Sequence, residues 1–305
     1  MAAHTTALRR LALPAAVSLV ALALTVAGAA QQRPWPGADR DPAVTPVSGS
    51  SWLHHLGLTL RNTWLGQGSG RYGPTPGQAV RPRAESLGVR RAVTLTGEDL
   101  YRLNCQACHR STGEGAPPEI HTLLGPVQGS SLAIVQQRLR EQHRAAGTRE
   151  IQADARRAHD QILTRLHQGG TRMPPRDYLQ DADMAALFAY LTQLAGTPDA
   201  QQPLRRTVSW ARLGEITVKG TCHICHDAVG PRPTDAALLD GAIPSLQSLV
   251  ASKTVAEFVR KARDGAVIQM GDVATPHRGR MPGFYYLTDE EIAAAYMYLS
   301  TYPPK

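Results

Sequence analysis

Two five-residue stretches dominate this 305-residue chain: Cys105-Gln106-Ala107-Cys108-His109 and Cys222-His223-Ile224-Cys225-His226. Each has the pattern C-x-x-C-H, which is the attachment pattern of haem c. Two thiols about one helical turn apart can add to the two vinyl groups of a porphyrin, and the adjacent imidazole can then bind the iron. The sequence therefore predicts two covalently bound haem c groups, attached through Cys105, Cys108, Cys222 and Cys225, with His109 and His226 as iron ligands.

Two other kinds of site use paired cysteines. Zinc ribbons usually separate their pairs by about 15–20 residues, whereas 117 positions separate Cys105 from Cys222. A zinc ribbon also gives no reason for a histidine directly after each pair. A thioredoxin-like motif belongs to alternating strands and helices, which this sequence lacks. Haem attachment uses all four cysteines and leaves none for a disulfide.

From about Thr94 the chain repeats itself, with shared landmarks around each motif. A glycine lies eight residues before the first cysteine, a Met-Pro pair follows the motif, and a Tyr-Leu pair comes seventeen residues after that methionine. In the first copy these landmarks are Gly97, Met173-Pro174 and Tyr190-Leu191, and in the second they are Gly214, Met281-Pro282 and Tyr298-Leu299.

The periodicity around these landmarks predicts helices. Residues 183–194 carry apolar side chains at helical spacing, and Thr288 to Glu291 has the pattern of a capping box. Further helices are expected around Leu132 to Leu139 and around Val255 to Ala262. No convincing alternating strand is found, so the predicted fold class is all-α. The glycine of each first helix is where the last helix of that copy could cross it.

Each copy resembles a class I cytochrome c domain, and the pair is similar to two-domain dihaem cytochromes c. The resemblance covers residues 94–302, and we place the domains at 94–200 and 201–305. It implies a small all-α fold around each haem, histidine and methionine on opposite faces of the iron, and one-electron transfer through an exposed haem edge.

A thioether opposite an imidazole favours reduced iron. Met173 is the predicted ligand of the first iron and Met281 of the second. The alternatives are His121, His143, His159 and His167 for the first, and Met270 and His277 for the second. Met184 and Met297 are expected in the core. Pro126 and Pro244 are candidate carbonyl acceptors for the other nitrogen of each proximal imidazole, and His223 is expected to point to solvent.

The N-terminal region differs from the rest. Arg9-Arg10 precedes the uncharged run Leu11 to Ala30, which predicts a signal peptide or membrane anchor over residues 1–30 and a periplasmic location, soluble or anchored to the inner membrane. Residues 31–93 hold seven prolines and nine glycines and are predicted to be a linker. Ser51 to Leu65 could form a short helix that docks on a haem domain or on the membrane. His54 and His55 are interpreted as solvated side chains rather than iron ligands.

Charge argues against nucleic acid as a partner. The formal net charge of +8 comes mainly from the leader and from residues 31–93, where eight arginines face three acidic residues. Residues 94–305 carry 23 basic and 22 acidic side chains, so the motif-bearing region lacks the basic excess that nucleic-acid binding needs.

The predicted function is a dihaem carrier of single electrons in a periplasmic respiratory chain, without enzyme activity. Its partners would be a dehydrogenase or quinol-oxidising complex as donor and a terminal oxidase or reductase as acceptor. A dihaem peroxidase and a fixed cytochrome subunit of a larger complex remain alternatives.

Overall fold

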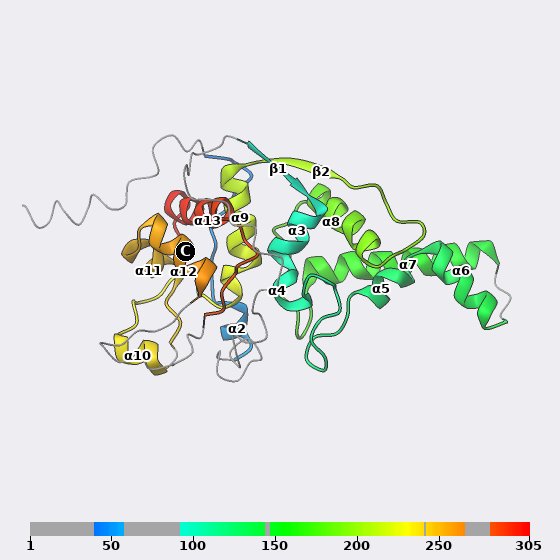
Figure 1. Cartoon of the computed structure of the whole chain (residues 1–305), viewed down its shortest axis with the longest axis horizontal. Coiled ribbons are helices and arrows are strands. Elements are labelled where there is room, and N and C mark those ends of the chain that lie inside the picture. Colours follow the sequence, from blue (N-terminus) through cyan, green and yellow to red (C-terminus); the bar gives the residue numbers. More distant parts are fainter. Residues whose placement is uncertain (1–39, 58–91, 144–146, 241, 266–280) are drawn as a thin grey trace, which may run out of the picture.

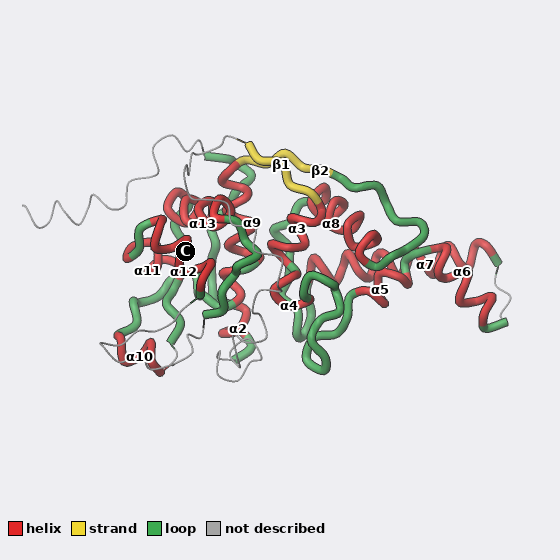
Figure 2. The backbone as a smooth tube through the Cα atoms, viewed as in Figure 1, coloured by secondary structure: helices red, strands yellow, loops and turns green. Residues whose placement is uncertain are grey.

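The computed structural model describes residues 40–57, 92–143, 147–240, 242–265 and 281–305, which are mostly helical, as the sequence predicts (Figures 1 and 2). We refer to residues 92–200 as the first half and to 201–305 as the second half. In chain order the elements are α2 (Trp52–His55), β1 (Ala92–Thr96), α3 (Gly97–Asn104), α4 (Gln106–His109), α5 (Leu124–Gly129), α6 (Leu132–Glu141), α7 (Thr148–Gln168), α8 (Asp181–Leu194), β2 (Arg205–Ser209), α9 (Trp210–Gly220), η4 (Cys222–Ile224), α10 (Asp235–Asp240), α11 (Leu246–Ser252), α12 (Val255–Asp264) and α13 (Asp289–Thr301).

The leader, residues 1–30, lies outside the described residues. Within the described ranges, none of the helices combines the length and the apolar character needed to cross a membrane.

A helix crossing organises each half. A Cβ added to Gly97 in α3 would lie 2.1 Å from the carbonyl oxygen of Ala186 in α8, and one added to Gly214 in α9 would lie 2.2 Å from that of Ala294 in α13. Only a residue without a side chain allows the backbones to approach this closely. The prediction that the first and last helices cross at these glycines is confirmed in both halves.

Gly97→Ala should therefore destabilise the protein by about 1–3 kcal/mol or more, because the new methyl group would meet backbone that cannot move aside. Gly125→Ala in α5 is the matched control, since a Cβ there has nothing within 4 Å and alanine favours helix by up to about 1 kcal/mol. Urea unfolding followed by circular dichroism compares the two. Equal stabilities would contradict the close crossing.

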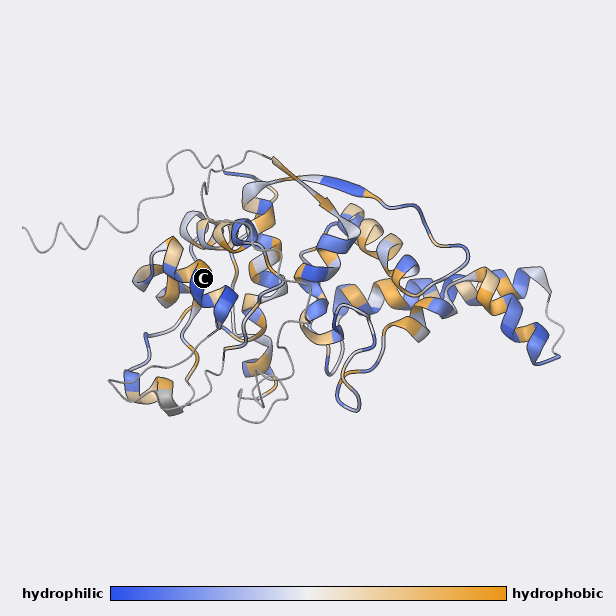
Figure 3. Cartoon of the chain, in the orientation of Figure 1, coloured by the Kyte–Doolittle hydropathy of each residue, from blue (hydrophilic) through white to orange (hydrophobic). Residues whose placement is uncertain are grey.

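The helix starts follow their sequence signals. Thr96, Ser209, Thr254 and Thr288 each cap a helix through the side-chain oxygen, and Thr288 with Glu291 forms the predicted capping box. The expected helices around Leu132 and Val255 are also present. The longest described helix, the 21-residue α7, has no counterpart of that length in the second half. With α6 it extends away from the body of the molecule (Figure 1), and the far end of α6 is hydrophilic (Figure 3).

The prediction of no strand is wrong. β1 and β2 form an antiparallel pair in which Ala92 lies opposite Ser209 and Thr96 opposite Arg205. Each strand runs directly into the helix that leads to a motif, so the pair joins the two halves (Figure 1). The signal is weak in sequence because each strand has five residues and buries only one of them.

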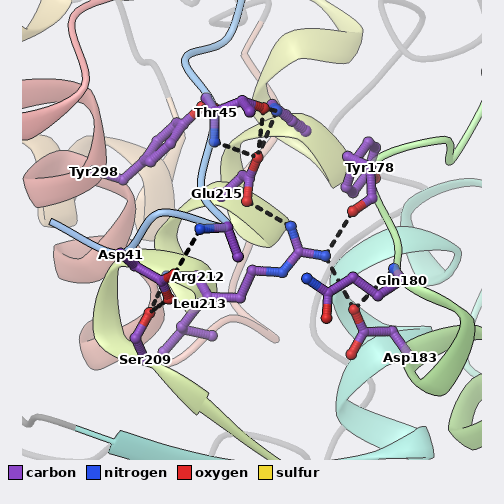
Figure 4. A network of polar contacts seen from close by, with 12 residues as sticks. Asp41, Thr45, Tyr178, Gln180, Asp183, Ser209, Arg212, Leu213, Glu215 and Tyr298 are labelled. Atoms are coloured by element: carbon purple, nitrogen blue, oxygen red, sulfur yellow. Dashed lines mark hydrogen bonds and ion pairs between the residues drawn. The ribbon is translucent and has the colours of Figure 1, made fainter.

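Polar contacts join the halves further. Arg102 of α3 donates to Glu291 of α13, and the Thr221 hydroxyl donates to the Leu103 carbonyl at 2.7 Å. Arg212 of α9 is the centre of a buried network, where it reaches Asp183 of α8 at 3.0 Å and the Tyr178 carbonyl at 2.6 Å (Figure 4). The two halves therefore share a desolvated polar interface as well as the strand pair.

Residues 40–57, part of the predicted linker, pack on the second half. Val44, Val47 and Leu53 are buried, and the Lys305 backbone N–H donates to the Val47 carbonyl at 3.0 Å. The Tyr298 hydroxyl donates to the Thr45 carbonyl at 2.6 Å. A helix is present at Trp52–His55, within the expected 51–65 stretch, whose residues 58–65 lie outside the described residues. The linker prediction is therefore corrected for this segment, which has a fixed place in the fold.

Candidate functional site

The first cysteine pair lies on a single helical turn. Cys105 ends α3 and precedes α4, and the backbone N–H groups of Cys108 and His109 donate to the Cys105 carbonyl at 3.1 and 2.8 Å. Side chains three and four residues apart on such a turn lie on one face. The turn therefore presents two thiols and one imidazole together.

The second motif repeats this arrangement on a tighter turn. Cys225 and His226 donate from their backbone N–H groups to the Cys222 carbonyl at 3.2 and 3.0 Å. α9 leads directly into the second motif, as α3 leads into the first. The hydrogen bond between Thr221 and Leu103 holds the ends of these two helices side by side.

All four cysteines are free and desolvated. Burial raises the pKa of Cys105, Cys222 and Cys225 to about 12, and it raises the pKa of Cys108 as well. At neutral pH these thiols are protonated, unlike the low-pKa thiolates of disulfide oxidoreductases. The alternative of a thioredoxin-like site finds no support in this environment.

The imidazole of His226 has the orientation that a ligand needs. Its Nδ1 lies 2.7 Å from the Pro244 carbonyl oxygen, which confirms the prediction for Pro244. Burial lowers the pKa of His226, and the Pro244 carbonyl partly offsets this. A neutral ring that donates from Nδ1 leaves Nε2 free to bind a metal.

His109 differs. Its Nδ1 is buried and has no hydrogen-bond partner among the residues described. Burial lowers the pKa of His109, and the nearby backbone of His121 opposes this, although the two groups lie outside hydrogen-bonding geometry. The prediction for Pro126 is wrong, since this residue lies within the short helix α5.

The two Met-Pro loops repeat one another in three dimensions. Each follows a helix that ends at a glycine with positive φ, Gly169 at +71° and Gly265 at +78°. A Cβ on either glycine would lie 2.5 or 2.8 Å from the carbonyl oxygen of Met173 or Met281. Both methionines are half-buried and pack against the core. The glycines therefore let each loop turn back closely on the helix before it.

In each half one backbone hydrogen bond fixes the residue that lies three positions after the methionine. The third residue after Met173 is Arg176, whose N–H donates to the Leu166 carbonyl at 2.9 Å. The third residue after Met281 is Phe284, whose N–H donates to the Ala262 carbonyl at 2.9 Å. Arg176 and Phe284 thus occupy matched positions, because each donates to the carbonyl that lies three residues before the helix-ending glycine. This equivalence is independent of the sequence spacing.

One cavity touches both motifs. From the first motif it is lined by Ala107 and Cys108, and from the second by Ile224 and Cys225. Residues 282–284 of the second Met-Pro loop complete its wall, together with Thr221 and Tyr286. The two cysteine pairs are therefore neighbours across the interface between the halves.

These residues fit haem c. Each half offers two protonated thiols one turn apart and an adjacent imidazole that is neutral by burial. The buried Nδ1 of His109 and the buried Nε of Arg176 are polar atoms that lack a partner in the described part of the chain. A zinc ribbon would require a compact ligand set, yet no three His, Cys, Asp or Glu side chains gather to hold a metal ion within the described ranges.

The other predicted candidates have the following places. His223 is half-buried with its Nδ1 2.9 Å from the His226 carbonyl oxygen, so the prediction that it points to solvent is wrong. His159 packs edge-to-face on Phe188. Met184 and Met297 are in the core, as predicted. His121, His143 and His167 are exposed, and so are His54 and His55. Met270 and His277 lie outside the described residues.

Sequence reasoning missed Arg176. It is 4 % exposed, and its Nη2 donates to the Asn104 carbonyl at 2.7 Å, directly before Cys105. An arginine in a polar, proline-rich stretch gives no signal of burial, since arginine is rarely buried.

Comparison with known proteins gives one match. Residues 95–195 match the family model described as Cytochrome c. Neither the curated proteins nor the solved structures contain a match to the chain.

Proposed function

On the premise that residues 95–195 form a cytochrome c domain with covalently bound haem c, we propose that the whole chain binds two haem c groups and carries single electrons. The observation that carries this proposal is the repetition of the site in the second half. The turn at Cys222, the Met-Pro loop after Gly265 and the helix crossing at Gly214 all reproduce contacts of the matched region.

Each residue of the second site would have a defined role. Cys222 and Cys225 would form the thioether bonds, and His226, oriented by Pro244, would bind the iron. Met281 would supply the sixth ligand, as Met173 would in the first half. Haem iron supplies the exchange between the ferrous and ferric states. The protein would hold the ligands, keep water away from the iron and bring the two groups together across the shared cavity.

We place this carrier in the periplasm, with residues 1–30 as signal peptide or anchor. Attachment of haem c and the leader pattern support that location. Its partners would be a dehydrogenase or quinol-oxidising complex as donor and a terminal oxidase or reductase as acceptor.

Carbon monoxide binding tests the proposal, because an iron atom that holds a histidine and a methionine in addition to the four porphyrin nitrogens would have no open position. We expect about two haems and little bound carbon monoxide per chain. Met281→Ala should open one position and raise carbon monoxide binding to about one per chain, whereas the control Met270→Ala should change nothing. A wild-type protein that binds carbon monoxide and consumes peroxide would instead support the peroxidase alternative.

A further inference from the structure

The two motifs differ in their electrostatic surroundings at matched positions. The repeat pairs Arg176 with Phe284, and it pairs Arg110, which follows His109, with Asp227, which follows His226. At both positions the first half has a cation where the second half has a neutral or an anionic side chain. This difference bears directly on the relative ease of reducing the two sites.

Arg176 is the stronger of the two cations because it is buried. Its guanidinium lies at the backbone of Asn104 and Pro175, 2.7 and 3.2 Å from their carbonyl oxygens. No carboxylate is within salt-bridge distance of it in the described ranges, and its Nε has no partner there. The Asn104 carbonyl that it contacts directly precedes Cys105, so the positive charge lies beside the first motif. A charge in such a site is poorly screened by solvent.

Asp227 has the opposite sign beside the second motif. Its carboxylate accepts hydrogen bonds from the Ser51 backbone N–H at 2.6 Å and lies 2.8 Å from His54 Nδ1. Its side chain is one-third exposed, so its influence is partly screened. Arg110 is exposed, and its effect on the first motif is correspondingly weak.

The two proximal imidazoles also differ, and their difference likewise makes the second site easier to oxidise. His226 donates to the Pro244 carbonyl, and such a bond makes the imidazole a stronger donor to metal. The matched Nδ1 of His109 has the His121 backbone near it, but no hydrogen bond of comparable geometry within the part of the chain described. A stronger donor stabilises ferric iron, so this difference also favours oxidation of the second site.

We propose that the first haem has the higher reduction potential, so that electrons enter at the second half and leave from the first. A buried cation disfavours the extra positive charge of ferric iron, whereas an anion favours it. In each transfer one electron leaves the second haem, which is oxidised, and reaches the first, which is reduced. No proton or other reactant is needed. The inference rests on the proposed dihaem function and adds a direction to it.

A redox titration of the full-length dihaem protein, followed by its absorption spectrum, tests this order. We expect two waves in the wild type. Arg176→Gln should lower the upper wave by about 59 mV, which corresponds to a tenfold change in equilibrium constant for one electron, and should leave the lower wave in place. Arg176→Lys, which keeps the charge, should shift the upper wave much less. Asp227→Asn should raise the midpoint potential of the lower wave by an amount that corresponds to about a threefold change in the same equilibrium constant.

The two substitutions identify the waves, so the order is tested twice. An Arg176→Gln shift confined to the lower wave, no shift at all, or an Asp227→Asn shift of the upper wave would each overturn the inference. The last result would do so even if Arg176→Gln failed to fold. Haem content measured on the same samples separates the two levels: one haem per chain refutes the dihaem proposal, whereas two haems in the reverse order refute only the direction.

Discussion

Replacement of Cys222 and Cys225 together by serine should leave one covalently bound haem per chain, because serine cannot form the thioether bonds. The first motif should keep its haem, since its cysteines and His109 are held by α3 and α4 of the other half. Intact mass after denaturation measures the result directly. This is the largest change in cofactor content that we predict.

The matched control is the pair Cys105→Ser and Cys108→Ser, which should remove the other haem. If either double variant retains two covalently bound haems, the assignment of its motif is wrong. If the protein binds haem only through residues 105–109, the second motif serves another purpose and the dihaem proposal fails.

Arg212→Met should lower the free energy of unfolding by about 3–5 kcal/mol, because it removes the buried cation that bridges two buried carboxylates. Asp183 and Glu215 are 0 % and 1 % exposed, and Arg212 is 5 % exposed. The guanidinium also satisfies the Tyr178 carbonyl, so its removal affects both halves at once (Figure 4). Urea unfolding of the holoprotein, followed by circular dichroism, measures the loss.

Arg206→Met is the control for this prediction. Arg206 also reaches Asp183, at 3.4 Å, but its side chain is 31 % exposed. An ion pair of this kind contributes about 0–1 kcal/mol. A loss from Arg212→Met no larger than that from Arg206→Met would show that the buried network does not hold the halves together.

Much of the architecture follows from local patterns in the sequence. Sequence alone predicts the crossing glycines, the capping box at Thr288 and the Pro244 carbonyl. Each depends on residues close to a motif or on an internal comparison of the two copies. The Met-Pro pairs were found in the same way, and their loops have matching backbone contacts. Binding of iron by Met173 and Met281 remains a prediction.

The features that sequence reasoning missed depend on contacts between distant residues. β1 and β2 are separated by more than 100 positions, and neither strand has an alternating pattern long enough to detect. Residues 40–57 contain many turn-forming residues, and only their packing against the second half gives them a fixed place. Pro126 lies within the helix α5, whereas Pro244 lies in the irregular stretch just before α11, so the two prolines of similar spacing do not share a local structure.

The docking of residues 40–57 also sets the order in which the molecule can be completed. Tyr298 and Tyr302 reach Thr45 and Asp41 across 253 and 261 positions, and Lys305 pairs with Val47. At a synthesis rate of about 5–20 residues per second, the early segment waits on the order of ten to fifty seconds for these partners. Val44 and Val47 therefore stay solvated until residues 298–305 have been made. Residues 298–305 thus close the fold over this early segment, and a chain cut short before Tyr298 would leave the segment open to proteases.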